Sequence, residues 1–298
     1  MGSPRASFLV TAPDQPGLVA RFAGFFHVLG LNIVDSTHHS EPARKDAPAR
    51  FFMRIVVDLE ALSGAPAQKA LDGSPTRQAL EGAFARLAAE LSATHSVGYS
   101  DRIARVALMV TRDPATFYDL VLRQKNGELP CEIACVLSNH AHLEDAAASF
   151  RLPFFHLPIT PETRVDQEAR VLDLLRRHHV DLVVLARYMQ ILSGGFLRDA
   201  PPVINIHHGF LPAFQGAKPY HQAYARGVKL IGATAHYATE DLDQGPIIEQ
   251  DVARVTHQAD PEEMVRIGRD VERLVLSRAV RAHLERRVVV DGSRTIIL

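Results

Sequence analysis

Three polar residues with complementary chemistry, Asn205, His207 and Asp243, lie within one stretch of the chain, residues 203–251. Asn205 and His207 end an apolar run typical of a buried strand, and Asp243 follows a second such run in a turn-forming segment. An asparagine amide can stabilise a negatively charged oxygen, and an imidazole and a carboxylate can accept and return protons near neutral pH. These residue types indicate an acid–base site with an oxyanion-stabilising group.

Each of these residues also has an ordinary structural explanation. Asn205 can cap a turn, His207 is one of 15 histidines, and Asp243 stands in the turn sequence LDQGP. A metal site is not predicted, because His207 and His208 are adjacent at a strand end and point to opposite faces. The chain lacks a P-loop, a G-x-S-x-G nucleophile elbow and, in its second half, the G-x-G-x-x-G of a dinucleotide site.

Length and composition narrow the remaining functions. The 298 residues are enough for two domains, and 33 basic and 34 acidic residues give a formal net charge of −1. This balance predicts no nucleic-acid partner, and no apolar run is long enough to predict a membrane partner. The start, MGSPRASFLV, lacks the apolar core of a signal peptide, so we expect a cytoplasmic protein. Cys131 and Cys135 lie in an apolar segment and are expected to be buried, reduced thiols.

The first hundred or so residues show strand and helix patterns in the order β-α-β-β-α-β, which predicts a ferredoxin-like α+β domain over residues 6–98. The expected strands are 6–12, 31–37, 51–59 and a segment near Val97, and the expected helices are 18–29 and 76–93. The sequence DQPG at 14–17, between a strand and a helix, resembles the ACT domain family. That resemblance implies a site for a small effector, usually an amino acid, at Asp14 and Gly17. A plain turn is the alternative, with Asp14 as helix cap and Gly17 as a permissive backbone position.

A short linker at 99–103 precedes a second domain at 104–298, whose pattern predicts a doubly wound, mostly parallel α/β fold. The expected strands include 105–111, 133–138, 154–157 and 181–186, and the expected helices are 114–125, 141–150, 162–178 and one near Phe196. The nearly continuous apolar run 181–186 is typical of a parallel strand buried on both faces. A long helix over 261–285 and a hairpin turning at Asp291-Gly292 complete the chain.

An ordered set of motifs in the second domain resembles the formyltransferase family that uses 10-formyltetrahydrofolate. The motifs are NIH at 205–207, LP at 211–212, GATAH at 232–236 and LDQGPI at 242–247. The longer strings HHGFLPAF at 207–214, GAKPYHQAYARGVK at 216–229 and GPIIEQDV at 245–252, with the ACT-like domain, are similar to the hydrolytic branch of the family. The resemblance implies hydrolysis of 10-formyltetrahydrofolate to tetrahydrofolate and formate, with formate supplied for purine synthesis. It implies no cofactor, because the folate is the substrate.

The implied substrate carries an N-formyl group, to which water must add before the nitrogen leaves. Asn205 would donate its amide N–H to the oxyanion, and one such donor is typically worth about 10²–10³ in rate. His207 would stabilise the oxyanion or move a proton, and Asp243 would accept a proton from water, orient His207 or return a proton to the nitrogen. Which of the two is the general base stays open. His236 resembles a family histidine near the site and would support Asp243 or a water, with an indirect supporting role as the alternative.

The segment 187–193, RYMQILS, follows the buried strand and resembles the family's pterin-binding segment. The residues predicted to bind folate are Met189, Gln190, Ile191 and Leu192 on one wall, and Ala238, Thr239 and Glu240 on the other. The side chains of Met189 and Ile191 would form an apolar surface, and backbone groups of Gln190 and Leu192 would bind the ring edge. Core packing is the alternative for Met189 and Ile191.

Two other functions need to be weighed. A transferase acting on glycinamide ribonucleotide must bind a phosphate, and that branch of the family has a Gly- and Ser-rich loop after the first strand. The corresponding loop here, 111–116, has no glycine, an aspartate (Asp113) that would repel phosphate, and a proline that lacks an N–H. Water is therefore the expected acceptor. A catalytically silent folate or amino-acid sensor would not need Asn205, His207 and Asp243 together.

Two positions depart from the family pattern. Gly209 stands where a serine is expected, and Gly194-Gly195 makes the segment after the pterin-binding residues unusually flexible. The motif residues themselves are intact. The ACT-like domain and the long C-terminal helix also predict a homo-oligomer.

Overall fold

A computed structural model of the chain describes residues 3–45, 47–213 and 219–298. The chain forms two compact units, and each is described by itself. The N-terminal unit extends to Arg102 and includes Arg286–Val289 and Ile296–Leu298, and the α/β unit comprises Ile103–Glu285 and Val290–Thr295.

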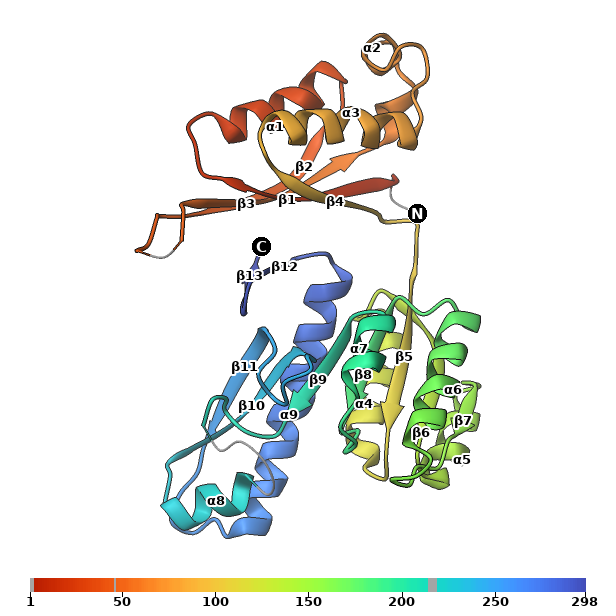
Figure 1. The fold of residues 1–298 in the computed structure, drawn as a ribbon, viewed down its shortest axis with the longest axis vertical. Helices are drawn as coiled ribbons and strands as arrows, with labels where there is room; N and C mark the ends of the chain where they lie inside the picture. The colour runs from red at the N-terminus through yellow and green to blue at the C-terminus, as the bar shows by residue number, and fades with distance from the viewer. Residues whose placement is uncertain (1–2, 46, 214–218) are drawn as a thin grey trace. The chain divides into compact units, whose positions relative to one another are not determined.

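A four-stranded antiparallel sheet with helices on one face forms the N-terminal unit (Figure 1). Its elements are β1 (Arg5–Pro13), α1 (Leu18–Val28), β2 (Ile33–Glu41), β3 (Arg50–Asp58), the 3-10 turn η1 (Glu60–Ser63), α2 (Ala65–Ala70), α3 (Arg77–Glu90) and β4 (Thr94–Tyr99). The strands lie in the order β2-β3-β1-β4. This arrangement confirms the predicted ferredoxin-like fold. The turn η1 and helix α2 occupy a connector in which no helix was predicted.

Aromatic rings fill the core of the N-terminal unit. Burial alternates along β1, as expected of a strand with one face against helices, and Phe8 is completely buried. The ring of Phe8 lies 4.5 Å from that of Phe84 on α3 and 5.0 Å from that of Phe26 on α1, measured between centroids. Phe22 stacks on Phe84 at 5.8 Å. Because each ring buries a large apolar area, these contacts join both helices to the sheet.

Helix α1 begins without a side-chain cap. Its N-cap residue is Gly17, which has a left-handed backbone with φ of 89° and has no side chain that could cap the helix. The alternative in which Asp14 caps this helix is therefore excluded. Asp14 lies before the N-cap, and its Oδ1 accepts a hydrogen bond from Oγ of Ser40 at 3.2 Å. Gly17 does supply a permissive backbone, since side-chain-bearing residues rarely adopt positive φ.

The remaining elements follow in chain order. They are β5 (Ala104–Val110), α4 (Pro114–Lys125), β6 (Cys131–Ser138), η2 (Ala141–Leu143), α5 (Glu144–Ser149), β7 (Phe154–His156), α6 (Arg164–Arg177), β8 (Leu182–Ala186), α7 (Gly194–Asp199), β9 (Val203–His207), α8 (Pro219–Arg226), β10 (Leu230–Tyr237), β11 (Ile247–Arg254), α9 (Pro261–Leu284), β12 (Val288–Asp291) and β13 (Arg294–Ile297).

A nine-stranded sheet joins these strands in the order β12-β13-β11-β10-β9-β8-β5-β6-β7. The strands from β7 to β9 in this order are all parallel. The chain runs outward from β5 to β6 and β7 and then returns to β8 on the other side of β5, which confirms the predicted doubly wound fold. Such a reversal opens a crevice at the carboxyl ends of the two central strands, here β5 and β8.

Helices cover both faces of the parallel part of the sheet. On one face, Val171 of α6 and Phe196 of α7 belong to the same core cluster as Met109 of β5. On the other face, Leu120 of α4 and Val280 of α9 surround Leu108, the neighbouring residue of β5. Since successive strand residues point to opposite faces, β5 is buried on both, and so is every residue of β8.

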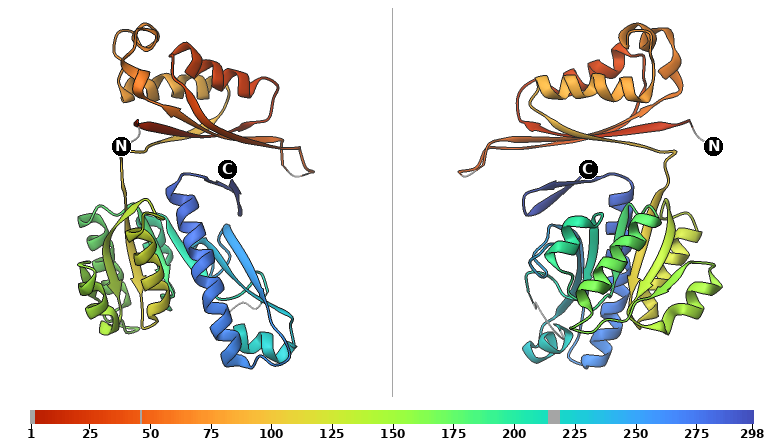
Figure 2. Two further views of the ribbon diagram at one scale, coloured as in Figure 1. Left: turned by 180° about the vertical axis from the view of Figure 1, so that it is seen from behind. Right: turned by 45° about the vertical axis from the view of Figure 1, so that its right-hand side comes forward.

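Beyond β9 the sheet becomes antiparallel. Strand β10 pairs with β9 on one side and with β11, a strand that was not predicted, on the other. Helix α9 runs along these three strands (Figure 2). No helix in the described ranges is long and apolar enough to cross a membrane. Cys131 and Cys135 of β6 are buried and unpaired, as predicted, and burial raises the pKa of each thiol to about 12.

Replacing Phe22 with alanine should lower the free energy of unfolding of the N-terminal unit by about 3–5 kcal/mol, because a buried ring and its stacking contact are lost. Val28→Ala is the matched control on the same helix, since Val28 is 64% exposed. Urea unfolding followed by circular dichroism measures both. Equal stability of the two variants would show that the buried face of α1 is wrongly assigned.

Candidate active site

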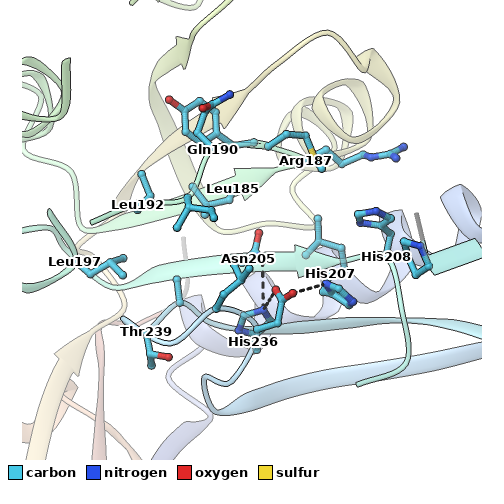
Figure 3. A pocket seen from close by; sticks show the side chains of 18 of the residues that line it. Leu185, Arg187, Gln190, Leu192, Leu197, Asn205, His207, His208, His236 and Thr239 are labelled. Atoms are coloured by element: carbon cyan, nitrogen blue, oxygen red, sulfur yellow. Dashed lines mark hydrogen bonds and ion pairs between the residues drawn. The ribbon is translucent and has the colours of Figure 1, made fainter. Parts of the chain in front are cut away.

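A cavity of about 570 Å³ lies at the carboxyl ends of β8 and β9. Every residue predicted to act in the reaction or to bind folate lines it, namely Asn205, His207, His236, Asp243, Met189, Gln190, Ile191, Leu192, Ala238, Thr239 and Glu240. Figure 3 shows Arg187 and His208 at one end of the cavity and Leu197 and Thr239 at the other. The volume and the mixture of apolar walls with a few polar groups are typical of a small-molecule site.

The antiparallel pair β9–β10 sets the spacing of the polar groups. Asn205 is directly opposite His236, and His207 is opposite Thr234. The pairing of β10 with β11 shifts register between Ala235 and His236, and such irregularities re-aim side chains beside functional sites. The side chains of Asn205, His207 and His236 consequently point toward one another (Figure 3).

His236 orients the amide of Asn205. Nδ1 of His236 lies 2.9 Å from the carbonyl oxygen of Tyr237, which can only accept, so Nδ1 carries the proton. Burial lowers the pKa of His236, so the ring is neutral at pH 7 and its Nε2 is an acceptor. The Nδ2 group of Asn205, 3.3 Å away, therefore donates one hydrogen to Nε2. Its second hydrogen remains available for a ligand oxygen.

Asp243 lies on the turn after β10, with a positive φ of 57° that aspartate tolerates better than most residues. Its Oδ2 is 3.1 Å from Nδ1 of His207, and both side chains are buried. The hydrogen bond from His207 lowers the pKa of Asp243, even though burial opposes this shift. The carboxylate is therefore ionised at neutral pH and can only accept, so Nδ1 of His207 carries the proton.

Two atoms of the histidine and aspartate side chains are not engaged in the hydrogen bonds described above. One is the buried Nε2 of His207. The other is Oδ1 of Asp243, which lies 3.8 Å from Nε2 of His236 and faces its lone pair rather than a proton. Buried polar atoms are rarely left unpaired. These two atoms are the ones that a bound ligand or water is expected to meet.

A buried hydroxyl holds the loop that follows β9. Oγ1 of Thr234 donates to the carbonyl of Gly209 at 2.9 Å and accepts from the backbone N–H of Leu211 at 3.1 Å. Nε2 of Gln250 donates to the same hydroxyl at 2.9 Å. The loop is thus fixed through the backbone of Gly209, so its attachment does not need the serine side chain expected there. Residues 214–218, which carry parts of two motifs, lie outside the described residues.

Gly245 allows the turn bearing Asp243 to lie against β10. A Cβ at this position would be 1.7 Å from the backbone oxygen of Tyr237, an atom that cannot move aside. The N–H of Tyr237 donates to the carbonyl of Pro246 at 3.0 Å, and the N–H of Ala238 donates to that of Val203 at 2.8 Å. Both ends of the turn are therefore tied to the sheet.

Met189 and Ile191 line the cavity and are not core residues. Their exposed fractions are 62% and 58%, which rules out the alternative of core packing. Two apolar side chains this exposed leave a surface on which a flat ring can lie. Figure 3 shows Gln190 and Leu192 on one side of Asn205 and Thr239 on the other.

A buried carboxylate on α6 braces this wall. Glu168 accepts hydrogen bonds from the backbone N–H of Ser193 at 2.9 Å and from the Ser193 hydroxyl. Arg164, one turn earlier, lies 3.5 Å from Glu168 and donates to the carbonyl of Ile191 at 2.6 Å. The segment is thereby fixed through its backbone. Sequence reasoning did not find Glu168, because its contact spans 25 residues and no motif includes it.

The two walls meet at Gly194. A Cβ on this residue would be 2.6 Å from the carboxylate of Glu240, which pairs with Arg198 at 2.6 Å. The glycine that departs from the family pattern therefore makes room for a side chain of the opposite wall.

Five polar residues of the cavity were not among the predicted catalytic and folate-binding residues: Arg187, Tyr188, His208, Tyr220 and His221. Arg187 directly follows the buried strand β8, a position where a parallel sheet presents functional side chains, so the signal was there to use. Burial lowers the pKa of His208 to about 4, so this ring is neutral. No cluster of three or more His, Cys, Asp or Glu residues suited to a metal ion occurs in the part of the chain that the structure describes.

The N-terminal unit has a cavity of its own, of about 490 Å³. Asp14 and Gly17, the residues predicted to bind an effector, line it together with His38 and Ser40. The structure thus brings the two predicted residues to one cavity within this unit.

Comparison with known proteins identifies relatives that span both units. The model of the formyl transferase family matches residues 104–280. A formyltetrahydrofolate deformylase of Synechocystis sp. is 44% identical over 294 residues, which cover 98% of this chain and 98% of that protein. A crystal structure of a formyltetrahydrofolate deformylase from Pseudomonas syringae pv. tomato has a TM-score of 0.90 and 43% identity, covering 100% of this chain and 95% of that one.

A glycinamide ribonucleotide transformylase from Symbiobacterium toebii shares only part of the structure. Its crystal structure has a TM-score of 0.62 and 30% identity and covers 66% of this chain and 94% of that one. The likeness to the deformylases therefore extends over the whole chain, whereas the likeness to this transformylase does not.

Replacing Glu168 with glutamine should weaken folate binding about tenfold, because charge-assisted hydrogen bonds to the cavity wall are lost. Asp173→Asn is the matched control, since Asp173 lies on the same helix and pairs with exposed Arg177. Tetrahydrofolate binding measured by calorimetry gives both affinities. If the two variants bind equally well, Glu168 does not brace the wall.

Proposed function

This chain belongs to the formyltetrahydrofolate deformylase family, and on that premise we propose that it hydrolyses 10-formyltetrahydrofolate to tetrahydrofolate and formate. The convergence of Asn205, His207 and Asp243 in one cavity carries the proposal. The reaction returns free tetrahydrofolate to one-carbon metabolism and supplies formate, which purine synthesis can use.

Attack by water requires a base beside the formyl carbon. Oδ2 of Asp243 is engaged by His207, whereas Oδ1 has no donor within hydrogen-bond distance in the described ranges. We assign Oδ1 as the acceptor of the water proton, because the depressed pKa of Asp243 keeps it ionised. The water oxygen then bonds to the formyl carbon, and the carbonyl oxygen becomes an oxyanion.

The oxyanion is stabilised by groups already oriented for it. Asn205 offers the amide hydrogen that His236 does not use. His207 is held through Nδ1 by Asp243, which directs its unpaired Nε2 into the site; in the imidazolium form, which carries a proton on both nitrogens, Nε2 would donate to the same oxygen. Both groups are fixed by neighbours before substrate binds, so little reorganisation accompanies the reaction.

Collapse of the intermediate breaks the bond between the formyl carbon and the folate nitrogen. That nitrogen leaves with the electron pair and needs a proton, which the newly protonated Asp243 returns. Formic acid and tetrahydrofolate result, Asp243 is ionised again, and the acid loses its proton to solvent as formate. The pterin lies on Met189 and Ile191, with backbone groups of Gln190 and Leu192 at the ring edge and the 238–240 segment opposite.

Transfer to an amine is the second candidate, and the loop after β5 argues against it. In this loop Asp113 is the N-cap of α4 and Pro114 occupies the first turn, so a negative charge stands where a phosphate would need free N–H groups. The N-terminal unit is also unmatched by the transformylase, which covers 66% of the chain.

The N-terminal unit is proposed to bind an amino acid. Asp14 offers a carboxylate for an ammonium group, and the turn at Gly17 exposes the first N–H groups of α1 to a carboxylate. Self-association of the chain is proposed as well, since β2 and β4 are edge strands of the four-stranded sheet with unpaired backbone groups.

Incubation with 10-formyltetrahydrofolate and no amine should release formate and tetrahydrofolate in equal amounts. Asn205→Ala should lower kcat by about 10²–10³, the typical effect of removing one oxyanion donor. Asp243→Asn should lower kcat at least as much, because the proton acceptor is lost. Formate is assayed with an excess of a coupled formate dehydrogenase.

The control is Asp241→Asn, an exposed carboxylate in the same turn, which should keep normal turnover. Folate binding by all three variants should stay close to that of the wild type. Absence of formate from the wild type would exclude the hydrolase, and normal kcat in Asn205→Ala or Asp243→Asn would exclude the proposed site.

An amino acid that binds the N-terminal unit should change the rate of formate release and raise the melting temperature of the protein. Gly17→Ala should abolish both effects, because alanine is strained at φ of 89°. Gly24→Ala on the same helix, where a Cβ meets nothing within 4 Å, is the control. A screen of the twenty amino acids by thermal shift tests this, and no response to any of them would refute the effector site.

A further inference from the structure

Arg187 lines one end of the cavity and belongs to a second cluster of charged residues. The Nη1 of Arg187 is 2.6 Å from Oδ2 of Asp113, and the Nε of Arg269 is 3.5 Å from the same oxygen. The side chains of Asp113 and Arg187 are only 15% and 17% exposed, so solvent screens their pairing weakly. Asp113 is thus an anion held by two guanidinium groups.

The first turn of α4 adds a third favourable partner. Asp113 is the N-cap of this twelve-residue helix, and its Oδ1 accepts the backbone N–H of Ala115 at 2.9 Å. Free N–H groups and the positive end of a helix dipole attract anions. Arginine pairs and helix N-termini are the groups that proteins use to bind phosphate. In this chain a side-chain carboxylate already occupies both.

Arg187 is fixed from its other side as well. Its Nε lies 3.5 Å from Oε2 of Glu272, a residue of α9 whose side chain is only 1% exposed. Oε1 of Glu272 accepts a hydrogen bond from the hydroxyl of Tyr220 at 2.7 Å. Gly268, one turn before Glu272, makes room for the Tyr220 ring, since a Cβ there would be 2.1 Å from the hydroxyl oxygen. The guanidinium therefore cannot turn into the cavity without breaking pairs on both sides.

The cluster stands where the sheet reverses direction. Thr111 follows β5 and Arg187 follows β8, and Oγ1 of Thr111 donates to the carbonyl of Arg187 at 3.2 Å. This is the crevice in which doubly wound folds bind their ligands. Arg187, His208 and Tyr220 also line the cavity that contains Asn205 and Asp243. A second substrate entering beside the formyl group would meet this cluster.

We propose that Asp113 is an internal anion that pairs with Arg187 beside the active-site cavity, takes the place that a substrate phosphate would occupy on this arginine, and so excludes amine acceptors that carry a phosphate. Asp113 is then a specificity-determining residue, and water is the acceptor because the anion site is already occupied. The exclusion of acceptors rests on the proposed hydrolase function. The occupied anion site itself does not, and it can be tested separately.

Removal of the charge should open the site to inorganic phosphate. Asparagine can still cap α4, so Asp113→Asn removes the charge and preserves the cap. We expect this variant to bind phosphate at least about tenfold more tightly than the wild type, because the guanidinium groups become free to pair with it. Calorimetric titration with sodium phosphate measures the affinity, with sodium chloride of equal ionic strength as the reference for salt screening.

Three further variants make the result specific. Asp260→Asn removes the N-cap carboxylate of α9, which accepts the N–H of Glu263 at 2.8 Å, and should bind phosphate no better than the wild type. Asp113→Asn combined with Arg187→Gln should lose the gain. Asp113→Ser, whose hydroxyl also caps helices, should repeat the gain and covers a failure of the asparagine variant to fold.

The outcomes separate cleanly. The proposal is supported if both Asp113 variants bind phosphate more tightly than the wild type and if Arg187→Gln removes this gain. It is also supported if the melting temperature of an Asp113 variant rises in phosphate but not in chloride. Equal affinity of wild type and variants, or a gain that survives Arg187→Gln, overturns it. Asp113 variants that stay unfolded at every phosphate concentration overturn it too, since a dissolved anion then cannot replace the carboxylate. Formate release by the wild type, measured in parallel, reports on the hydrolase function alone.

Discussion

The carboxylate of Asp243 lies between two buried imidazoles, and the rest of the site depends on that arrangement. One imidazole, His207, donates to it and is thereby fixed in a single tautomer. The other, His236, takes its tautomer from the carbonyl of Tyr237 and turns toward Asn205 instead. One ionised group and one backbone carbonyl thus determine where every proton in the cluster resides. Nε2 of His207 and the second amide hydrogen of Asn205 remain available to a ligand in the cavity.

Two polar clusters of opposite character contribute residues to the wall of the cavity. The cluster of Asn205, His207 and Asp243 retains unpaired atoms, which a ligand can engage. The cluster around Asp113 and Arg187 pairs its charges with one another and with the first turn of α4. The same physical rule explains both, since a buried polar group must find a partner in the protein or in a ligand. One cluster therefore keeps atoms available for a ligand, whereas the charges of the other are paired within the protein.

The sequence predicted the alternation of strands and helices and the residues that line the cavity, because both follow from local periodicity and ordered motifs. It did not predict that His236 orients Asn205, since this contact depends on the register of β9 against β10. Glu168 and Tyr220 were missed for the same reason, because their partners come from distant segments. Arg187 was missed although its position directly after a buried strand could have indicated it. The alternative in which Asp14 caps α1 does not hold, since sequence alone does not show that Gly17 takes the N-cap position with a positive φ.

Pairing of β9 with β10 also ties assembly of the proposed catalytic site to the completion of folding. Asn205 and His207 come from one strand, while His236 and Asp243 come from the other strand and the turn after it, with α8 between the two strands in the chain. Pairings between distant segments form late, because closing the intervening loop is entropically unfavourable. A nascent chain that has formed only the strands up to β8 contains none of these four residues in place. The proposed catalytic site is thus complete only in fully folded molecules.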